Sequence, residues 1–188
     1  QREVAKTGSS RQAVTKECKI YPCSYEGRKL NVVDTPGFEA TSESNEAIRS
    51  EIVSKVPNLL HDGIDAFFFL SPIGRTPDAQ TVDMIDFLNS LITEQGFSRG
   101  FVVFSKADQV LMDPDEEESE IELFKESVLS VAPQAELFLN SVKYLFYRHS
   151  CAYKGDVVLT RAQCRREFLN HAYSEIFKLC EANNGKTF

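Results

Sequence analysis

The sequence predicts an α/β fold with three layers and a mainly parallel β-sheet. Short apolar runs that read as buried strands alternate with longer stretches of helical periodicity, the pattern of βαβ units. Two of the predicted strands end abruptly in polar residues, one after Val33 and one after Phe104. Because ligands of such folds bind outside the carboxyl ends of the strands, these two breaks mark the candidate site.

Length and composition narrow the possible functions. The 188 residues suffice for one domain, or for one domain with a short appendage. The chain is 42% hydrophobic and 26% charged, which is ordinary for a globular protein. Its net charge of −7 argues against general binding of nucleic acid or of anionic membranes, because no basic excess exists to attract phosphates over a wide surface.

The cysteines indicate a reducing compartment. Their number is odd, and no two of them have the C-x2-C spacing of a zinc site: Cys18, Cys23, Cys151, Cys164 and Cys180. We therefore expect reduced thiols and a cytoplasmic protein. The longest apolar run, residues 66–70, is too short to cross a membrane, and no signal peptide is visible.

The first part of the chain predicts a hairpin and a helix. Apolar runs on both sides of Glu26 and Gly27 predict two antiparallel strands, and Pro22 places the first of them at a sheet edge. A helix is expected from about Asn45, since Ile48, Ile52, Val56 and Leu60 follow at helical spacing.

The later elements are predicted from the same two kinds of pattern. Residues 63–72 and 100–105 read as buried parallel strands. Thr76 and Pro77 have the residue types of an N-cap and a first helical position, so a helix is expected to begin there. Further helices are expected near residues 119–131 and 160–182, with a mixed segment near 136–153 between them.

The first polar break has the form D-x-x-G. Asp34 stands where a carboxylate can reach a metal ion, and Gly37 can offer its N–H group to a terminal phosphate. Alone, this pattern is also typical of a plain turn, because proline and glycine favour turns.

The second break, Ser105 to Asp108, has the form S-K-x-D and resembles the N/T-K-x-D motif with which GTP-binding proteins read guanine. The Asp108 carboxylate can accept two hydrogen bonds from guanine, which adenine cannot offer in that arrangement. The methylenes of Lys106 can pack over the base while its ammonium group stays in water. Because the two motifs occur in this order, each at the end of a predicted strand, together they support nucleotide binding more strongly than either motif alone.

Longer stretches carry a family resemblance. Residues 13–41, with the V-T-K-x-C opening, and the G-R-T-x-x-x-Q box that begins at Gly74 are its most specific parts. Over roughly residues 4–155 the chain resembles the immunity-associated GTPases, the GIMAP or AIG family of G domains, and more distantly septins and the chloroplast-import GTPases. The resemblance implies a P-loop NTPase G domain that binds GTP or GDP with Mg²⁺.

The resemblance also implies roles for individual residues. Thr15 corresponds to the switch-one threonine, which with Asp34 would hold the metal. Thr7 corresponds to a nucleotide-contacting position, and Lys154 stands in the last base-contacting motif. The complete set of expected nucleotide-binding residues is Thr7, Thr15, Asp34, Gly37, Ser105, Lys106, Asp108 and Lys154.

Three departures from the family pattern bear on function. The phosphate loop G-x-x-x-x-G-K-[ST] is absent, and "KTGSS" at residues 6–10 lies downstream of its place. Lys154 replaces the asparagine of the last base motif. Phe38 stands where Ras-like enzymes place a water-orienting glutamine, so intrinsic hydrolysis would be slow unless another group or a second subunit supplied catalysis.

The absent loop also predicts a gap in the sheet. In this fold the strand before the phosphate loop lies between the strands at 29–34 and 64–70, and its loss leaves unpaired backbone groups that cost on the order of 1–3 kcal/mol each. We therefore expect an amino-terminally truncated piece of a larger protein. Residues 1–155 would form a partial G domain, and residues 156–188 a carboxyl-terminal helix that packs on it or extends it.

Two functions of different classes are consistent with these residues. The first is a GTP-binding switch domain, a possible slow GTPase that acts through G-domain homo-oligomers. The second is a degenerate, nucleotide-free G domain that serves as a protein–protein scaffold. A cysteine or serine hydrolase is set aside, because the chain has no nucleophile elbow and no paired histidine.

Overall fold

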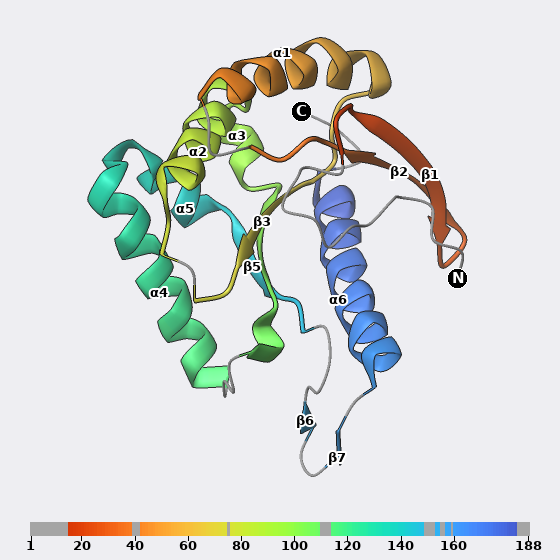
Figure 1. Cartoon of the computed structure of the whole chain (residues 1–188). Helices are drawn as coiled ribbons and strands as arrows, with labels where there is room; N and C mark the ends of the chain where they lie inside the picture. The colour runs from red at the N-terminus through yellow and green to blue at the C-terminus, as the bar shows by residue number, and fades with distance from the viewer. Residues whose placement is uncertain are drawn as a thin grey trace. The chain divides into compact units, whose positions relative to one another are not determined.

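The computed structural model describes residues 15–38, 42–74, 76–109, 114–148, 153–154, 157–158 and 160–183 (Figure 1). The chain divides into two compact units, Gln1–Gly63 and Ile64–Phe188. Each unit is described by itself below.

The first unit contains a hairpin and one helix. Strand β1 (Lys19–Tyr25) pairs in antiparallel register with β2 (Arg28–Asp34), so that Lys19 lies opposite Asp34. Glu26 and Gly27 both have positive φ, 48° and 79°, as a tight two-residue hairpin turn requires. The hairpin predicted at this dipeptide is confirmed. Helix α1 (Ser42–Leu59) begins three residues before the predicted Asn45.

The second unit is built on a three-stranded parallel sheet. Strands β3 (Phe67–Pro72), β4 (Gly100–Ser105) and β5 (Lys143–Phe146) lie in the order β3-β4-β5. Both strands predicted as parallel are present and pair with each other. The prediction that both are buried holds for β4 but is wrong for β3, because Phe68 and Leu70 of β3 are exposed. The third strand, β5, lies within residues 136–153, for which the sequence predicts only a mixed segment.

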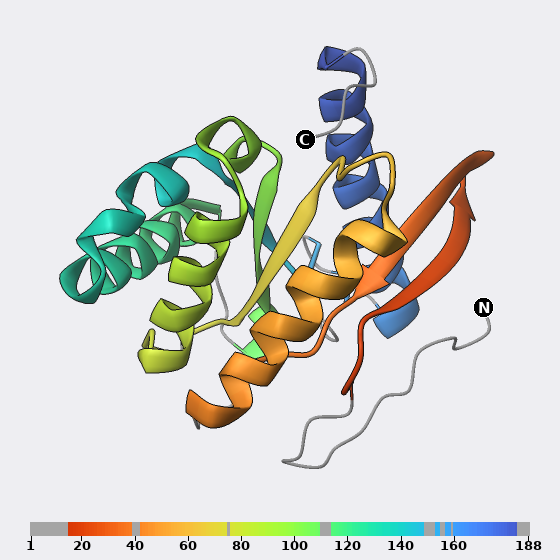
Figure 2. The same ribbon diagram turned by 90° about the horizontal axis from the view of Figure 1, so that it is seen from above.

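Helices cover both faces of this sheet (Figure 2). One face carries α2 (Ala79–Leu91), α4 (Pro114–Val131) and α5 (Glu136–Ser141), with the short α3 (Glu94–Phe97) beside them. The opposite face carries the long α6 (Arg161–Ala182). This helix–sheet–helix arrangement confirms the predicted three-layer α/β class within the unit. Strands β6 (Tyr153–Lys154) and β7 (Val157–Val158) form a separate antiparallel pair.

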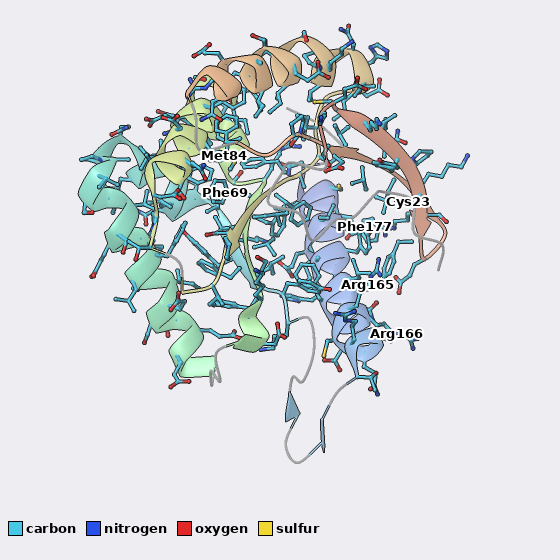
Figure 3. All side chains as sticks on the ribbon, in the orientation of Figure 1. Cys23, Phe69, Met84, Arg165, Arg166 and Phe177 are labelled. Carbon is cyan, nitrogen blue, oxygen red and sulfur yellow. The ribbon has the colours of Figure 1, made fainter. Side chains whose placement is uncertain are left out.

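Alternating side chains of the strands fill two cores. On the α2–α4–α5 side, Phe69, Val102 and Phe104 pack with Ile85, Val128, Phe138 and Leu139. On the α6 side, Phe101, Val103 and Leu145 pack with Ala172 and Ile176. Phe69 and Phe177, labelled in Figure 3, come from the sheet and from α6 respectively. Since the interior strands have apolar residues on both faces, they read as continuous apolar runs in the sequence.

Strands β2 and β3 are edge strands of their respective sheets. Among the described residues, β2 pairs only with β1, and β3 pairs only with β4. Phe68 and Leu70 of β3 lie on the same face as their partners Phe101 and Val103. Helix α6 buries those partners, whereas Phe68 stays 44% exposed and Leu70 65% exposed. The edge of β3 is therefore strongly apolar, which is unusual for an edge strand.

Two predicted helix starts are wrong. Helix α2 begins at Ala79, because Asp78, and not Thr76, is the N-cap: its Oδ1 accepts a hydrogen bond from the Thr81 N–H at 3.0 Å. Helix α4 begins at Pro114, five residues before the predicted 119, and proline suits the first turn of a helix. No helix in the described part of the chain is both long and apolar enough to cross a bilayer.

Candidate functional site

Two groups of predicted site residues are present in the structure, one in each unit. The metal-side cluster consists of Thr15, Asp34 and Gly37 in the first unit. The base-reading loop consists of residues 105–108 in the second unit. Thr7 and Arg75 lie outside the described residues. Lys154 lies in β6, and its backbone pairs with Val157.

The metal-side cluster forms where β2 ends. Asp34 is the last residue of β2, and its Oδ2 accepts a hydrogen bond from the Thr15 hydroxyl at 3.0 Å. Both side chains are partly buried. Two residues that are 19 positions apart in sequence therefore bring two oxygen atoms to one point. The prediction that they act together is consistent with this geometry, although their role in binding metal stays a prediction.

The donor chemistry of this cluster fits Mg²⁺. A hydroxyl and a carboxylate are hard oxygen ligands, and Mg²⁺ is typically held by one or two protein oxygens, with phosphates and water completing its coordination. No group of three or more histidine, cysteine or acidic side chains that could hold a metal occurs among the described residues. The cluster thus suits a metal that a phosphate helps to hold better than a metal held by protein alone.

Gly37 leaves room for a ligand next to its backbone. A Cβ built on Gly37 would meet no heavy atom within 4 Å. Pro36 beside it is buried, while Gly37 itself is exposed. An exposed glycine with no side chain and no atom where a Cβ would lie allows a ligand to come close to the backbone, as the D-x-x-G pattern predicts.

Helix α1 contacts the chain segments on which the metal-side cluster lies, at two points. The Glu51 carboxylate accepts a hydrogen bond from the Cys18 N–H at 3.1 Å, three residues after Thr15. The Arg49 guanidinium lies 5.6 Å from the centre of the Phe38 ring, directly after Gly37. Burial, followed by the charges of Glu51 and Asp34, raises the pKa of the Cys18 thiol to about 11. Neither contact could be predicted from local sequence patterns, because each joins residues distant in the chain.

The base-reading loop follows β4 and has a strained backbone. Lys106 is exposed and has φ of +59°, a left-handed conformation that non-glycine residues adopt rarely. Such strain is concentrated at functional sites, where the surrounding structure holds it in place. The next residue, Ala107, is fully buried and opens a short 3₁₀ turn that contains Asp108.

Backbone hydrogen bonds fix this loop to both neighbouring strands. The Ala107 N–H donates to the Tyr147 carbonyl at 3.0 Å, and the Tyr147 N–H donates to the Phe104 carbonyl at 2.8 Å. On the other side, the Ile73 N–H donates to the Ser105 carbonyl at 2.9 Å. The Ser105 hydroxyl also donates to the Ser71 carbonyl at 3.4 Å. Ser105 therefore has a structural contact in addition to its predicted place in the motif.

The glycine of the G-R-T box is also held in place. Gly74 has φ of +64°, which favours glycine, and its N–H donates to Glu120 Oε1 on α4 at 3.2 Å. Arg148, after β5, forms an ion pair with Glu117 on the same helix. Helix α4 thus supports the segments that follow β3 and β5.

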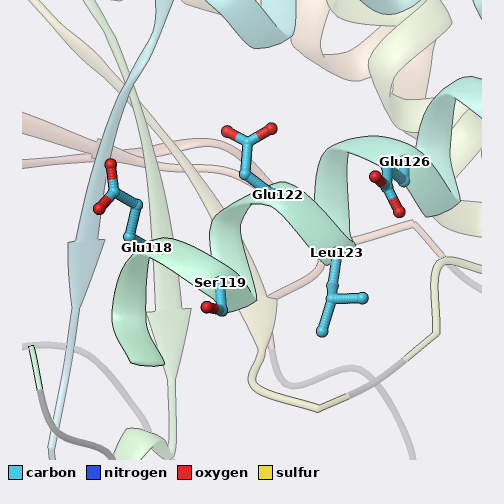
Figure 4. A pocket seen from close by; sticks show the side chains of 5 residues that line it. All are labelled: Glu118, Ser119, Glu122, Leu123 and Glu126. Atoms are coloured by element: carbon cyan, nitrogen blue, oxygen red, sulfur yellow. The ribbon is translucent and has the colours of Figure 1, made fainter. Parts of the chain in front are cut away.

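A shallow depression on α4 is a poor alternative site (Figure 4). Glu118, Glu122 and Glu126 line it together with Ser119 and Leu123. Three carboxylates repel an anionic phosphate, so this surface does not suit a nucleotide. The candidate residues therefore remain those that follow β2 in the first unit and those that follow β4 in the second.

Comparison with known proteins identifies the family. The AIG1 family model matches residues 1–129, well over half of the chain. The chain belongs to the AIG1 family. This AIG1 chain shows the residue pattern on which the sequence resemblance rested, and the resemblance is confirmed. No sequence relative was found among the curated proteins.

Solved structures confirm the G-domain fold of the AIG1 chain. Toc33 from Arabidopsis thaliana, in complex with Mg²⁺ and GMPPNP, matches with a TM-score of 0.59 and 12% identity over 98% of this chain and 76% of Toc33. A dimerization-deficient Toc33 mutant matches at 0.52 and 14% identity over 87% and 69%. LeoA, a bacterial dynamin GTPase from ETEC, matches at 0.57 and 15% identity over 94% of this chain and 33% of LeoA. At these identities the likeness shows the fold alone.

Proposed function

We propose that this AIG1 chain is part of a GTP-binding switch domain that binds GTP or GDP together with Mg²⁺. The observation that carries the proposal is the base-reading loop. Lys106 is held in a left-handed conformation at the carboxyl end of β4, and Asp108 follows in a short turn anchored to β5 through Ala107. A loop that a fold strains and anchors in this way suits a motif that must present one carboxylate to a base.

The metal-side cluster supports the same proposal from the other unit. Thr15 and Asp34 offer two oxygen ligands, and Gly37, exposed and with no atom near the position of a Cβ, leaves room for a phosphate close to the backbone. When bound, Mg²⁺ would neutralise charge on the phosphates, with Thr15 and Asp34 as its protein ligands. The structure of Toc33 with Mg²⁺ and GMPPNP is that of a protein with the same fold, and it agrees with this choice of ligand.

Slow hydrolysis and self-association are finer parts of the proposal. Phe38 has no group that can orient water, and it lies beside the Arg49 guanidinium. Hydrolysis therefore requires a group from elsewhere, for which a second G domain is the simplest source. Residues that complete a catalytic site across an interface would make the reaction depend on protein concentration. We place the protein in the cytoplasm on the basis of its cysteines alone.

A nucleotide-free scaffold is the second candidate. One feature of the sequence favours it: Lys154 replaces an expected asparagine of the last base-contacting motif. In a scaffold the G-domain fold would be kept for its surfaces, and Asp34 and Asp108 would be retained only for structure.

Calorimetric titration distinguishes the two candidates. GTP, GDP and ATP are titrated separately into the protein, each with Mg²⁺ and again with EDTA. The switch domain predicts binding of GTP and GDP but not of ATP, with GTP affinity raised by Mg²⁺. Equal affinity for guanine and adenine nucleotides, or no binding of either, would exclude the switch domain and favour the scaffold. Turnover of GTP measured at several protein concentrations then tests self-association.

A further inference from the structure

The segment that carries Thr15 is attached to helix α1 by one carboxylate. Residues 15–18 precede β1 and belong to no helix or strand. The Cys18 N–H donates to Glu51 Oε1 at 3.1 Å across 33 residues of sequence. Hydrogen bonds from a backbone N–H to an ionised carboxylate are stronger than those between neutral groups. This bond therefore restrains a segment that has no regular structure of its own.

The restraint acts on the position of Thr15. Only Lys16 and Glu17 separate Thr15 from Cys18, and both are exposed. Cys18 is hydrogen-bonded to α1, and β1 begins at the next residue, Lys19. Because only two residues lie between Cys18 and Thr15, the position of Cys18 limits where Thr15 can lie. The Thr15 hydroxyl then reaches Asp34 Oδ2 at 3.0 Å. Glu51 touches neither Thr15 nor Asp34 in any described hydrogen bond, and it acts through the backbone between them.

Helix α1 also contacts the segment on the other side of Asp34. Arg49, two residues before Glu51, lies over the Phe38 ring at 5.6 Å. The same helix therefore contacts Cys18, which follows Thr15, and Phe38, which follows Gly37. A shift of α1 would move both segments, and a ligand that fixes Thr15 would in turn hold α1.

We propose that Glu51 is a positioning residue for the metal-side cluster: it holds Thr15 within hydrogen-bond distance of Asp34, where both oxygens would be available to Mg²⁺. The inference rests on the proposed function, since it assigns to Glu51 a role in binding Mg²⁺ and GTP together. Glu51 is not a ligand of the metal or of the nucleotide. Its effect is confined to the geometry of the Thr15 segment and to what depends on that geometry.

The experiment compares three variants of the full chain. Glu51→Ala removes the acceptor, and Glu51→Gln keeps an uncharged acceptor of the same shape. Glu46→Ala is the matched control, because Glu46 is an exposed acid on the same helix. Thermal unfolding measured by circular dichroism checks that each variant folds. If Glu51→Ala does not fold, Glu51→Gln takes its place in the measurements below.

The first readout needs no nucleotide. Hydrogen exchange of the Cys18 amide, followed by NMR, reports the bond to Glu51 directly. We expect exchange to accelerate in Glu51→Ala, to accelerate less in Glu51→Gln, and to be unchanged in Glu46→Ala. Unchanged exchange in Glu51→Ala would overturn the inference whether or not the protein binds GTP.

The second readout is the factor by which Mg²⁺ raises the affinity for a fluorescent GTP analogue over its affinity in EDTA. We expect this factor to fall about tenfold in Glu51→Ala, the lower limit for losing a group that orients a metal ligand. Glu51→Gln should restore part of the factor, and affinity in EDTA should not change. Faster Cys18 exchange with an unchanged Mg²⁺ factor would show a purely structural bond and overturn the proposal. Absence of GTP binding by the unmodified chain would instead overturn the proposed function.

Discussion

The Thr15 hydroxyl donates a hydrogen bond to Asp34 Oδ2 at 3.0 Å, which joins the segment before β1 to the end of β2. Both oxygens belong to the predicted metal ligands. The hydroxyl oxygen of Thr15 and the carboxylate of Asp34 are both hard oxygen donors that would suit Mg²⁺. The bond keeps these two predicted ligands side by side.

Replacing Thr15 by valine tests this pair. Thr15→Val keeps the shape of the side chain but removes its hydroxyl, so the pair loses one oxygen ligand. We expect the enhancement of GTP affinity by Mg²⁺ to fall by about tenfold or more, and affinity in EDTA to stay the same. Thr15→Ser retains the hydroxyl and is the control. Equal Mg²⁺ enhancement in the valine variant and the unmodified chain would exclude Thr15 as a ligand.

The second prediction concerns the base. Changing Asp108 to asparagine replaces one acceptor oxygen by a donor, so guanine loses a charge-assisted hydrogen bond. We expect GDP affinity to fall about ten- to hundredfold, and affinity for xanthosine diphosphate to rise. Competition with a fluorescent nucleotide measures both. Asp65→Asn makes the same chemical change at an exposed position before β3 and should change neither affinity. An unaltered preference in Asp108→Asn would show that this carboxylate does not read the base.

The third prediction is a pH dependence of stability. Glu175 on α6 forms ion pairs with Lys143 of β5 at 2.7 Å and with Lys178 at 2.6 Å. The hydrogen bond from Lys143, followed by that from Lys178, lowers the pKa of Glu175 from 4.5 to about 2. A depressed carboxyl pKa means that the unfolded chain binds more protons than the native one between these values. The stabilisation is therefore complete above pH 4.5 and is lost as the pH falls toward 2.

Denaturant unfolding of Glu175→Gln at pH 7 and pH 3 checks this dependence. Because both lysines are partly exposed, we expect a loss of about 1 kcal/mol at pH 7 and a smaller one at pH 3. Glu126→Gln, an exposed change on α4, controls for general loss of charge. A loss of stability in Glu175→Gln that is the same at both pH values would contradict the assignment.

The fourth prediction concerns Gly100, the first residue of β4. A Cβ at this position would lie 2.8 Å from Val142 Cγ1 and 2.9 Å from Phe67 Cε2, both closer than packed atoms approach. Gly100→Ala should therefore lower the free energy of unfolding by about 1–3 kcal/mol, measured by denaturant titration. Combining it with Phe67→Leu shortens the obstructing side chain and should recover part of the loss. Full stability of the single variant would show that the ring moves aside freely.

The sequence predicted the elements whose apolar pattern is long or whose turn chemistry is specific. The hairpin at Glu26 and Gly27 and the helix at 160–182 are confirmed, the latter with Thr160 as its N-cap. The start of α2 was missed, because Thr76 and Asp78 are both good caps and only the Asp78 bond to Thr81 decides between them. Strand β5 is too short, at four residues, for its periodicity to be read.

The residues of the candidate site could be proposed from the sequence, but their geometry could not. Asp34 and Asp108 could be found because each follows an apolar run that ends abruptly. The left-handed backbone of Lys106 could not, since lysine carries no preference for that conformation. The contact of Glu51 could not be predicted for another reason. Its hydrogen bond to Cys18 joins positions 33 residues apart, and no local sequence pattern indicates such a contact.

Among the described residues β3 has a strand partner on one side only, β4, and this has a practical consequence for work with the polypeptide. A row of backbone donors and acceptors flanked by Phe68 and Leu70, without one charge in the strand, is a template on which other extended chains can aggregate. The isolated 188-residue chain should scatter light increasingly with concentration and should recruit chaperones during expression. Leu70→Lys places a gatekeeper charge on that edge and should raise its solubility. If light scattering by Leu70→Lys equals that of the unmodified chain, aggregation does not begin at the edge of β3.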